Sequence, residues 1–197
     1  KATYDMSSVT FSDAHYTYDG TVKGLAVSGA LPAGVTVSYS EGRKDVGSTV
    51  ITATFVGSPN YNAIPSMQAE LVINHATLTV TTPSKSKVYD GNALTMEGGY
   101  TGLVNGETFT FVTTGTITDV GSVENSYTIT WNGTASRSNY AIVENLGTLT
   151  VTKATHDMSK VSFDDRTYTY DGTFRSIEIE GDLPAGIIVE YSSAMKD

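Results

Sequence analysis

The stretch Ser48–Val56, which reads STVITATFV, decides the fold class of this chain. Apolar and polar residues alternate along it, and alternation with period two is typical of a β-strand with one buried face. Its residue types, chiefly Val, Ile, Thr and Phe, suit a pleated, half-buried surface. The same alternation recurs in Glu70–Ile73, Thr77–Thr81, Tyr127–Trp131 and Thr148–Thr152. These runs predict β-strands in most parts of the chain.

The chain also repeats itself. Lys1–Asp45 aligns without a gap on Lys153–Asp197, and 25 of the 45 aligned pairs are identical. KATYDMSSVTF matches KATHDMSKVSF, and GALPAGVTVSYS matches GDLPAGIIVEYS. Self-similarity of this kind identifies a duplicated structural unit.

A more distant copy lies between these two. The matching motifs are TYDG (17–20) with VYDG (88–91), LPAG (31–34) with LVNG (103–106), and DVGS (45–48) with DVGS (119–122). Ala-Thr dipeptides at 2–3, 76–77 and 154–155 mark the joins. We therefore expect three units: unit 1 (residues 1–75), unit 2 (76–153) and unit 3 (154–197). Unit 3 ends at the counterpart of Asp45, so we expect it to correspond to the N-terminal half of a unit.

Turn residues separate the predicted strands. Asp-Gly, Asn-Gly, Pro and Ser clusters lie between them, and such clusters mark strand ends. No stretch of ten or more residues has an apolar stripe at helical spacing. We therefore expect an all-β fold, with each unit a small immunoglobulin-like β-sandwich in an elongated tandem array. The alternative is a β-grasp-like unit with one short helix, around Asn92–Glu97 in unit 2.

Composition narrows the function classes. The 197 residues include 21 acidic and 12 basic side chains, a net charge of −9, and no cysteine. The acidic balance argues against a nucleic-acid partner, because binding phosphates needs clustered Lys and Arg. The absence of cysteine excludes disulfides, thiolate metal sites and a cysteine nucleophile. No apolar run approaches the ~18–20 residues of a membrane span, so we expect no membrane insertion. The chain begins at Lys1 and not at Met, and we interpret it as a piece of a longer protein.

The motif that recurs in every unit is Tyr-Asp-Gly. It occurs as Tyr18-Asp19-Gly20, Tyr89-Asp90-Gly91 and Tyr170-Asp171-Gly172. Asp-Gly supplies the left-handed backbone that a tight turn requires, so we interpret the motif as structural. We expect its tyrosines in the core, with Phe55 and Trp131 between the sheets. Asn60-Tyr61 and Asn139-Tyr140 are expected to form corners whose tyrosines pack inward.

No residue pattern predicts catalysis, a cofactor or a resident metal. His15, His75 and His156 lack metal-ligand spacing, and the counterparts of His15 and His156 are Thr167 and Tyr4. Asp13 and the pair Asp164-Asp165 do not belong to the alternating carboxylate loop of a calcium site. No nucleophile elbow, phosphate loop or dinucleotide fingerprint occurs. We therefore expect a protein that is not an enzyme.

The motif set as a whole resembles a known family. Thr-Tyr-Asp-Gly-Thr, Leu-Pro-Ala-Gly-Val-Thr-Val-Ser-Tyr and Asn-Tyr-Asn in unit 1 are similar to the MBG domain of bacterial surface proteins. Lys-Val-Tyr-Asp-Gly-Asn and Leu-Val-Asn-Gly-Glu in unit 2 resemble the related YDG-type repeat. The resemblance covers essentially the whole chain. It implies tandem Ig-like repeats in large secreted or wall-anchored proteins, often adhesins, and it implies no ligand.

Two functions follow as expectations. The first is a structural segment of a bacterial cell-surface stalk, in which each unit contacts mainly the neighbouring repeats of its own chain. The alternative is an adhesin module that binds host mucin, glycan or another surface protein through exposed tyrosines. Tyr100 has no clear counterpart in the other units and is the candidate ligand-binding residue. A continuous exposed strip of Tyr16, Tyr39, Tyr100 and Tyr168 would favour binding, whereas buried or scattered tyrosines would favour the spacer.

Overall fold

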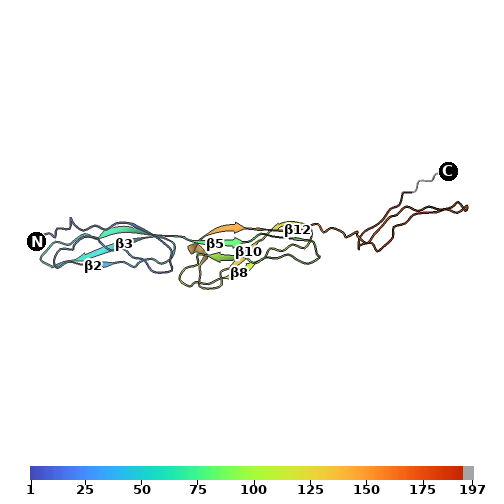
Figure 1. Ribbon diagram of the computed structural model, residues 1–197. Helices are drawn as coiled ribbons and strands as arrows, with labels where there is room; N and C mark the ends of the chain where they lie inside the picture. The colour runs from blue at the N-terminus through green and yellow to red at the C-terminus, as the bar shows by residue number, and fades with distance from the viewer. Residues whose placement is uncertain (193–197) are drawn as a thin grey trace.

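The computed structural model describes residues 1–192, and the last five residues of unit 3 lie outside the described part. The chain is all-β and elongated, with its units following one another from the N-terminus to the C-terminus (Figure 1). The all-β prediction is confirmed. The one helix within residues 1–192 is the 3-10 turn Arg137–Asn139. Residues 92–97, where the β-grasp alternative requires a helix, contain none; Leu94 there forms an antiparallel bridge with Ile117.

Unit 1 is built on one four-stranded sheet. Its strands lie in the order β1 (Ala14–Thr17), β4 (Met67–Asn74), β3 (Gly47–Val56) and β2 (Thr36–Tyr39). β1 is parallel to β4, and the other neighbours are antiparallel. Alternation along β3 directs Ile51, Ala53 and Phe55 to one face, where all three are buried. Val9 and Leu31, from segments outside the sheet, pack in the same cluster as Ala53 and Phe55, which confirms Phe55 as a core residue.

Unit 2 divides its strands among three small sheets, ordered β11-β5-β7, β6-β12-β9 and β10-β8. The strands are β5 (Ala76–Thr82), β6 (Lys85–Val88), β7 (Gly99–Thr101), β8 (Thr110–Thr113), β9 (Gly121–Glu124), β10 (Tyr127–Thr130), β11 (Tyr140–Leu146) and β12 (Thr148–Thr152). β5 and β11 are parallel and pair along their whole lengths, from Ala76 opposite Tyr140 to Thr82 opposite Leu146. β6 and β12 are parallel as well.

Two chain segments of unit 2 pass from one sheet into the next. β5 is followed by β6 after Pro83-Ser84, and β11 is followed by β12 after Gly147. A Cβ atom at Gly147 would clash with the backbone of Pro83, so the crossing of these segments requires glycine. The buried Asn125 holds the same region, because its side-chain amide donates to the carbonyls of Pro83 at 3.0 Å and Met96 at 2.9 Å. The sheets of unit 2 are therefore tied together where the strands change sheets.

Unit 3 forms no strand among its described residues. It has one antiparallel bridge, Ser162 opposite Glu180, which corresponds to Thr10 opposite Ser28 in unit 1. The counterparts of β1 and β2 are residues 166–169 and 188–191, and neither is a strand. In unit 1 these strands pair with β4 and β3, and the 197 residues contain no counterpart of β3 and β4 for unit 3.

Candidate functional site

The recurring Asp-Gly motif closes the same turn in every unit. In unit 1 the carboxylate of Asp19 accepts hydrogen bonds from the backbone N–H of Thr21 at 2.9 Å and its hydroxyl at 2.7 Å. Lys23 contacts the other carboxylate oxygen at 2.5 Å. The Lys23 ammonium, followed by the Thr21 donors, lowers the pKa of Asp19 to about 2. Gly20 adopts φ +76°, a conformation that favours glycine.

The other two copies repeat these contacts. Asp90 accepts from the N–H of Asn92 at 3.0 Å and pairs with Lys87, and Asp171 accepts from the N–H of Thr173 at 3.0 Å and pairs with Arg175. Gly91 and Gly172 have φ +77° and +78°. These carboxylates are engaged by side chains and backbone of their own turns, which is the geometry of a structural motif.

The tyrosine of the motif does not behave alike in the three units. Tyr18 is 3% exposed, as expected, whereas Tyr89 is 42% exposed and Tyr170 is 94% exposed. The expectation that all three lie in the core is therefore wrong for Tyr89 and Tyr170. The reason is that residues of the following unit cover Tyr18, so its burial depends on a neighbour and not on the motif.

Tyr18 is covered in part by a glutamate of unit 2, whose carboxylate accepts hydrogen bonds from two tyrosines. The hydroxyl of Tyr18 donates to Oε1 of Glu107 in unit 2, and the hydroxyl of Tyr140 donates to Oε2 of the same carboxylate at 2.5 Å. The rings of Tyr18 and Tyr140 meet edge to face, 5.8 Å between centroids. Burial first, and the acceptor Glu107 second, raises the pKa of Tyr140 to about 12 and raises that of Tyr18 as well.

A buried asparagine makes a second link between the units. Asn139 accepts from the backbone N–H of Val46 at 3.0 Å and donates to the carboxylate of Asp45 at 2.9 Å. Asn105 donates to the carbonyl of Gly20 at 3.4 Å. Together with the Glu107 contacts, these bonds define the junction between units 1 and 2.

Apolar packing continues across this junction. One buried cluster contains residues of unit 1 and residues of unit 2: Tyr18, Leu25, Ile51, Ala69, Leu71, Ile73, Ala76, Leu78, Ala135 and Tyr140. Trp131 is half-buried and packs against this cluster, so it contributes to the junction. Tyr140 packs inward as predicted from its Asn-Tyr corner.

Sequence reasoning did not identify Glu107 or Asn105 as functional residues, and it assigned Asn139 to a corner. One signal was present. The residue after LPAG, LVNG and LPAG is Val35, Glu107 and Ile187, and a carboxylate replaces an aliphatic side chain only in unit 2.

The candidate tyrosine strip is scattered. Tyr16 and Tyr39 lie on β1 and β2, the two opposite edges of the unit 1 sheet, Tyr100 lies on β7 of unit 2, and Tyr168 lies in unit 3. Tyr100 is 38% exposed, and its ring rests against Phe109 and Phe111 at centroid distances of 4.4 and 5.4 Å. The four tyrosines therefore form no continuous surface.

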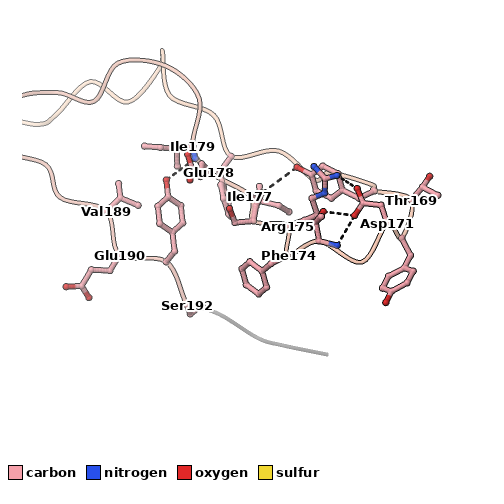
Figure 2. A pocket seen from close by; sticks show the side chains of 16 residues that line it. Thr169, Asp171, Phe174, Arg175, Ile177, Glu178, Ile179, Val189, Glu190 and Ser192 are labelled. Atoms are coloured by element: carbon pink, nitrogen blue, oxygen red, sulfur yellow. Dashed lines mark hydrogen bonds and ion pairs between the residues drawn. The ribbon is translucent and has the colours of Figure 1, made fainter. Parts of the chain in front are cut away.

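Two hollows in the described residues are large enough to consider as binding sites. A groove of about 530 Å³ lies between β10 and β11 and is lined by Tyr127, Trp131 and Glu144 among others. The hydroxyl of Tyr127 donates to Glu144 across it. A larger hollow of about 1000 Å³ lies in unit 3, where Figure 2 shows the Asp171–Arg175 pair and the side chains of Phe174, Ile177 and Val189 around it.

Potential ligands for a metal do not gather in residues 1–192. No three His, Cys, Asp or Glu side chains of this part of the chain come together in a way that would hold an ion. His15, His75 and His156 are exposed; the first two lie far apart in the sequence of unit 1, and the third lies in unit 3. Asp13 accepts a hydrogen bond from the N–H of Glu70 at 2.6 Å. No helix within these residues has the length and hydropathy to cross a membrane.

Comparison with known proteins supports the resemblance drawn from the motifs. Residues 78–150 match the family model described as MBG domain (YGX type), and this match lies within unit 2. No curated protein and no solved structure matches the chain. MBG domains are structural repeats that occur in surface proteins. The segment 78–150 is thus recognised as an MBG-type repeat, which is consistent with the MBG and YDG-type repeats that the motifs of units 1 and 2 resemble.

Proposed function

We propose that this chain is a non-enzymatic spacer, a segment of a repeat stalk in a bacterial cell-surface or secreted protein. In this proposal the protein is an adhesin whose stalk holds another domain away from the cell. The observation that carries the proposal is the junction, where units 1 and 2 share one buried cluster and join through Glu107 and Asn139. A junction of this kind resists bending, and a stiff array extends in proportion to its number of units. The extracellular location belongs to the same proposal.

The alternative, direct binding of mucin or glycan, is supported by one observation. Tyr100 is partly exposed beside Phe109 and Phe111, and an aromatic face of this kind suits contact with a sugar ring. The scatter of Tyr16, Tyr39 and Tyr168 over separate elements favours the spacer instead, because neighbouring units present no common aromatic surface.

A glycan array probed with the whole chain tests the two functions against each other. The spacer predicts no reproducible binding. Binding that Tyr100→Ala abolishes and Tyr39→Ala preserves would establish the alternative, since Tyr39 and Tyr100 are both 38% exposed and lie in different units. Circular dichroism of both variants checks that each retains its fold.

A further inference from the structure

We propose that Glu107 makes the junction selective: a unit that carries glutamate at this position docks rigidly onto the preceding unit, and a unit with Val or Ile there is joined flexibly. In this array the mechanical element is therefore the pair of unit 1 and unit 2, and not the single unit. The mechanical role of the junction rests on the proposed spacer function. The selectivity of the junction rests on the contacts described below.

The first step concerns what Glu107 does. Its two oxygens accept from Tyr18 of unit 1 and Tyr140 of unit 2, so one carboxylate joins hydroxyls of both units. Hydrogen bonds to an ionised acceptor are stronger than those between neutral groups. An aliphatic side chain at the same position would leave two hydroxyls of almost fully buried tyrosines without this acceptor, which is unfavourable.

The second step concerns how closely the units approach. A Cβ atom at Gly20 would lie 2.8 Å from Cβ of Asn105, whereas a Cβ atom at Gly91 or Gly172 would meet nothing within 4 Å. The three glycines occupy the same turn with almost the same φ. The glycine in the turn of unit 1 therefore lies against the following unit, and the equivalent glycine of unit 2 has no such neighbour.

The third step concerns the N-terminal end of unit 1, where Val35 replaces the glutamate. Tyr61, the counterpart of Tyr140, is covered there by Tyr4 of its own unit, with ring centroids 4.0 Å apart. The hydroxyl of Tyr4 also accepts from the N–H of Ser58 at 2.9 Å. Leu78 is the counterpart of Tyr4 in unit 2, because each residue directly follows an Ala-Thr join. Unit 2 therefore has no tyrosine of its own at this position, and the ring of Tyr140 packs against Tyr18 of unit 1 instead. The corner tyrosine of unit 1 is thus covered by a tyrosine of the same unit, whereas the corner tyrosine of unit 2 is covered by a tyrosine of the preceding unit.

The experiment measures the distance between units 1 and 2 with paired spin labels. Because the chain has no cysteine, Thr54→Cys and Thr128→Cys label one exposed site in each unit. The whole chain with Glu107 should give one narrow distance distribution. Glu107→Val introduces the residue type that unit 1 has at the equivalent position, Val35, and should broaden the distance distribution. Glu107→Gln keeps the size of the side chain, has one acceptor oxygen in place of two, and should give an intermediate width.

Glu144→Val is the matched control. Glu144 also accepts a hydrogen bond from a tyrosine of unit 2, Tyr127, but it lies away from the junction. Its variant should keep the narrow distribution. A narrow distribution for Glu107→Val, equal broadening in Glu144→Val, or a broad distribution before any substitution would each overturn the inference. Glycan binding by the unsubstituted chain would overturn the spacer function and leave these distances unchanged.

Discussion

Lys1–Asp45 and Lys153–Asp197 are closely similar in sequence, and the described part of the second segment, residues 153–192, differs in structure from the first. Their local contacts agree. The Asp-Gly turn, the hydrogen bond from Val27 to Tyr39 and that from Val9 to Met6 recur in unit 3 between the equivalent residues. The cation over the tyrosine ring recurs too, as Lys23 over Tyr16 and Arg175 over Tyr168. Contacts within about 20 residues therefore follow from the sequence of the segment itself.

Burial differs between the same two segments. Tyr18 is buried and Tyr170 is almost fully exposed, and Phe163 is 64% exposed although its counterpart Phe11 packs against the core of unit 1. β1 and β2 form only where β4 and β3 are present to pair with them. The comparison teaches that this repeat encodes its turns locally and its strands through distant partners.

Hydrogen exchange should reveal the largest difference. The amide of Tyr18 donates to the carbonyl of Asn74 at 2.8 Å inside a complete sheet, so we expect it to open with a free energy near that of global unfolding, roughly 5 kcal/mol or more. The amide of Tyr170 should exchange with little protection. Thr21 and Thr173, whose amides both bind the aspartate of their own turn, provide the control and should resemble each other. Equal protection of Tyr18 and Tyr170 would contradict the comparison.

Truncation of Tyr18 and of Tyr170 to alanine should lower the free energy of unfolding by different amounts, with a difference smaller than that expected in hydrogen exchange. Tyr18→Ala empties a buried site and removes a donor to Glu107, so we expect about 3 kcal/mol of lost stability. Tyr170→Ala should stay within about 0.5 kcal/mol, because the side chain is exposed. Urea denaturation followed by far-ultraviolet circular dichroism measures both, because the single tryptophan, Trp131, packs at the junction of units 1 and 2 and does not report on unit 3. Similar losses for the two variants would show that unit 3 has a core of its own.

Alkaline pH should weaken the junction by a lesser amount. An unfolded tyrosine has a pKa of about 10, and burial together with Glu107 raises the pKa of Tyr140 to about 12. The folded state therefore holds this proton more tightly, so its stabilisation is complete below pH 10 and is lost as the pH rises from 10 towards 12. The loss from this group is at most about 1.4 kcal/mol per pH unit. The denaturation midpoint should fall less between pH 8 and pH 11 for Tyr140→Phe than for the unsubstituted chain. Identical pH dependence of the two midpoints would show that the Tyr140 proton is not the cause of the loss.

Much of the fold was predictable from the sequence. The alternating runs Ser48–Val56, Thr77–Thr81 and Thr148–Thr152 lie in β3, β5 and β12, because burial of one face imposes period two on a strand. The Asp-Gly turns were predictable because left-handed backbone favours glycine.

The junction was not predictable in the same way. Glu107 and Asn139 are polar residues of types that usually lie in water, and only the approach of unit 1 brings them against Tyr18 and Val46. For the same reason Tyr89 and Tyr170, which share the motif of Tyr18, are exposed: the motif contains no information about what covers it.

The parallel pairing of β5 with β11 has a mechanical consequence. β5 opens unit 2 and β11 leads into its last strand, so tension applied to the two ends of the unit pulls these neighbouring strands in opposite directions along their length. The hydrogen bonds from Ala76–Tyr140 to Thr82–Leu146 are then loaded together in shear and cannot open one after another. Unit 2 has the strand geometry of a load-bearing link.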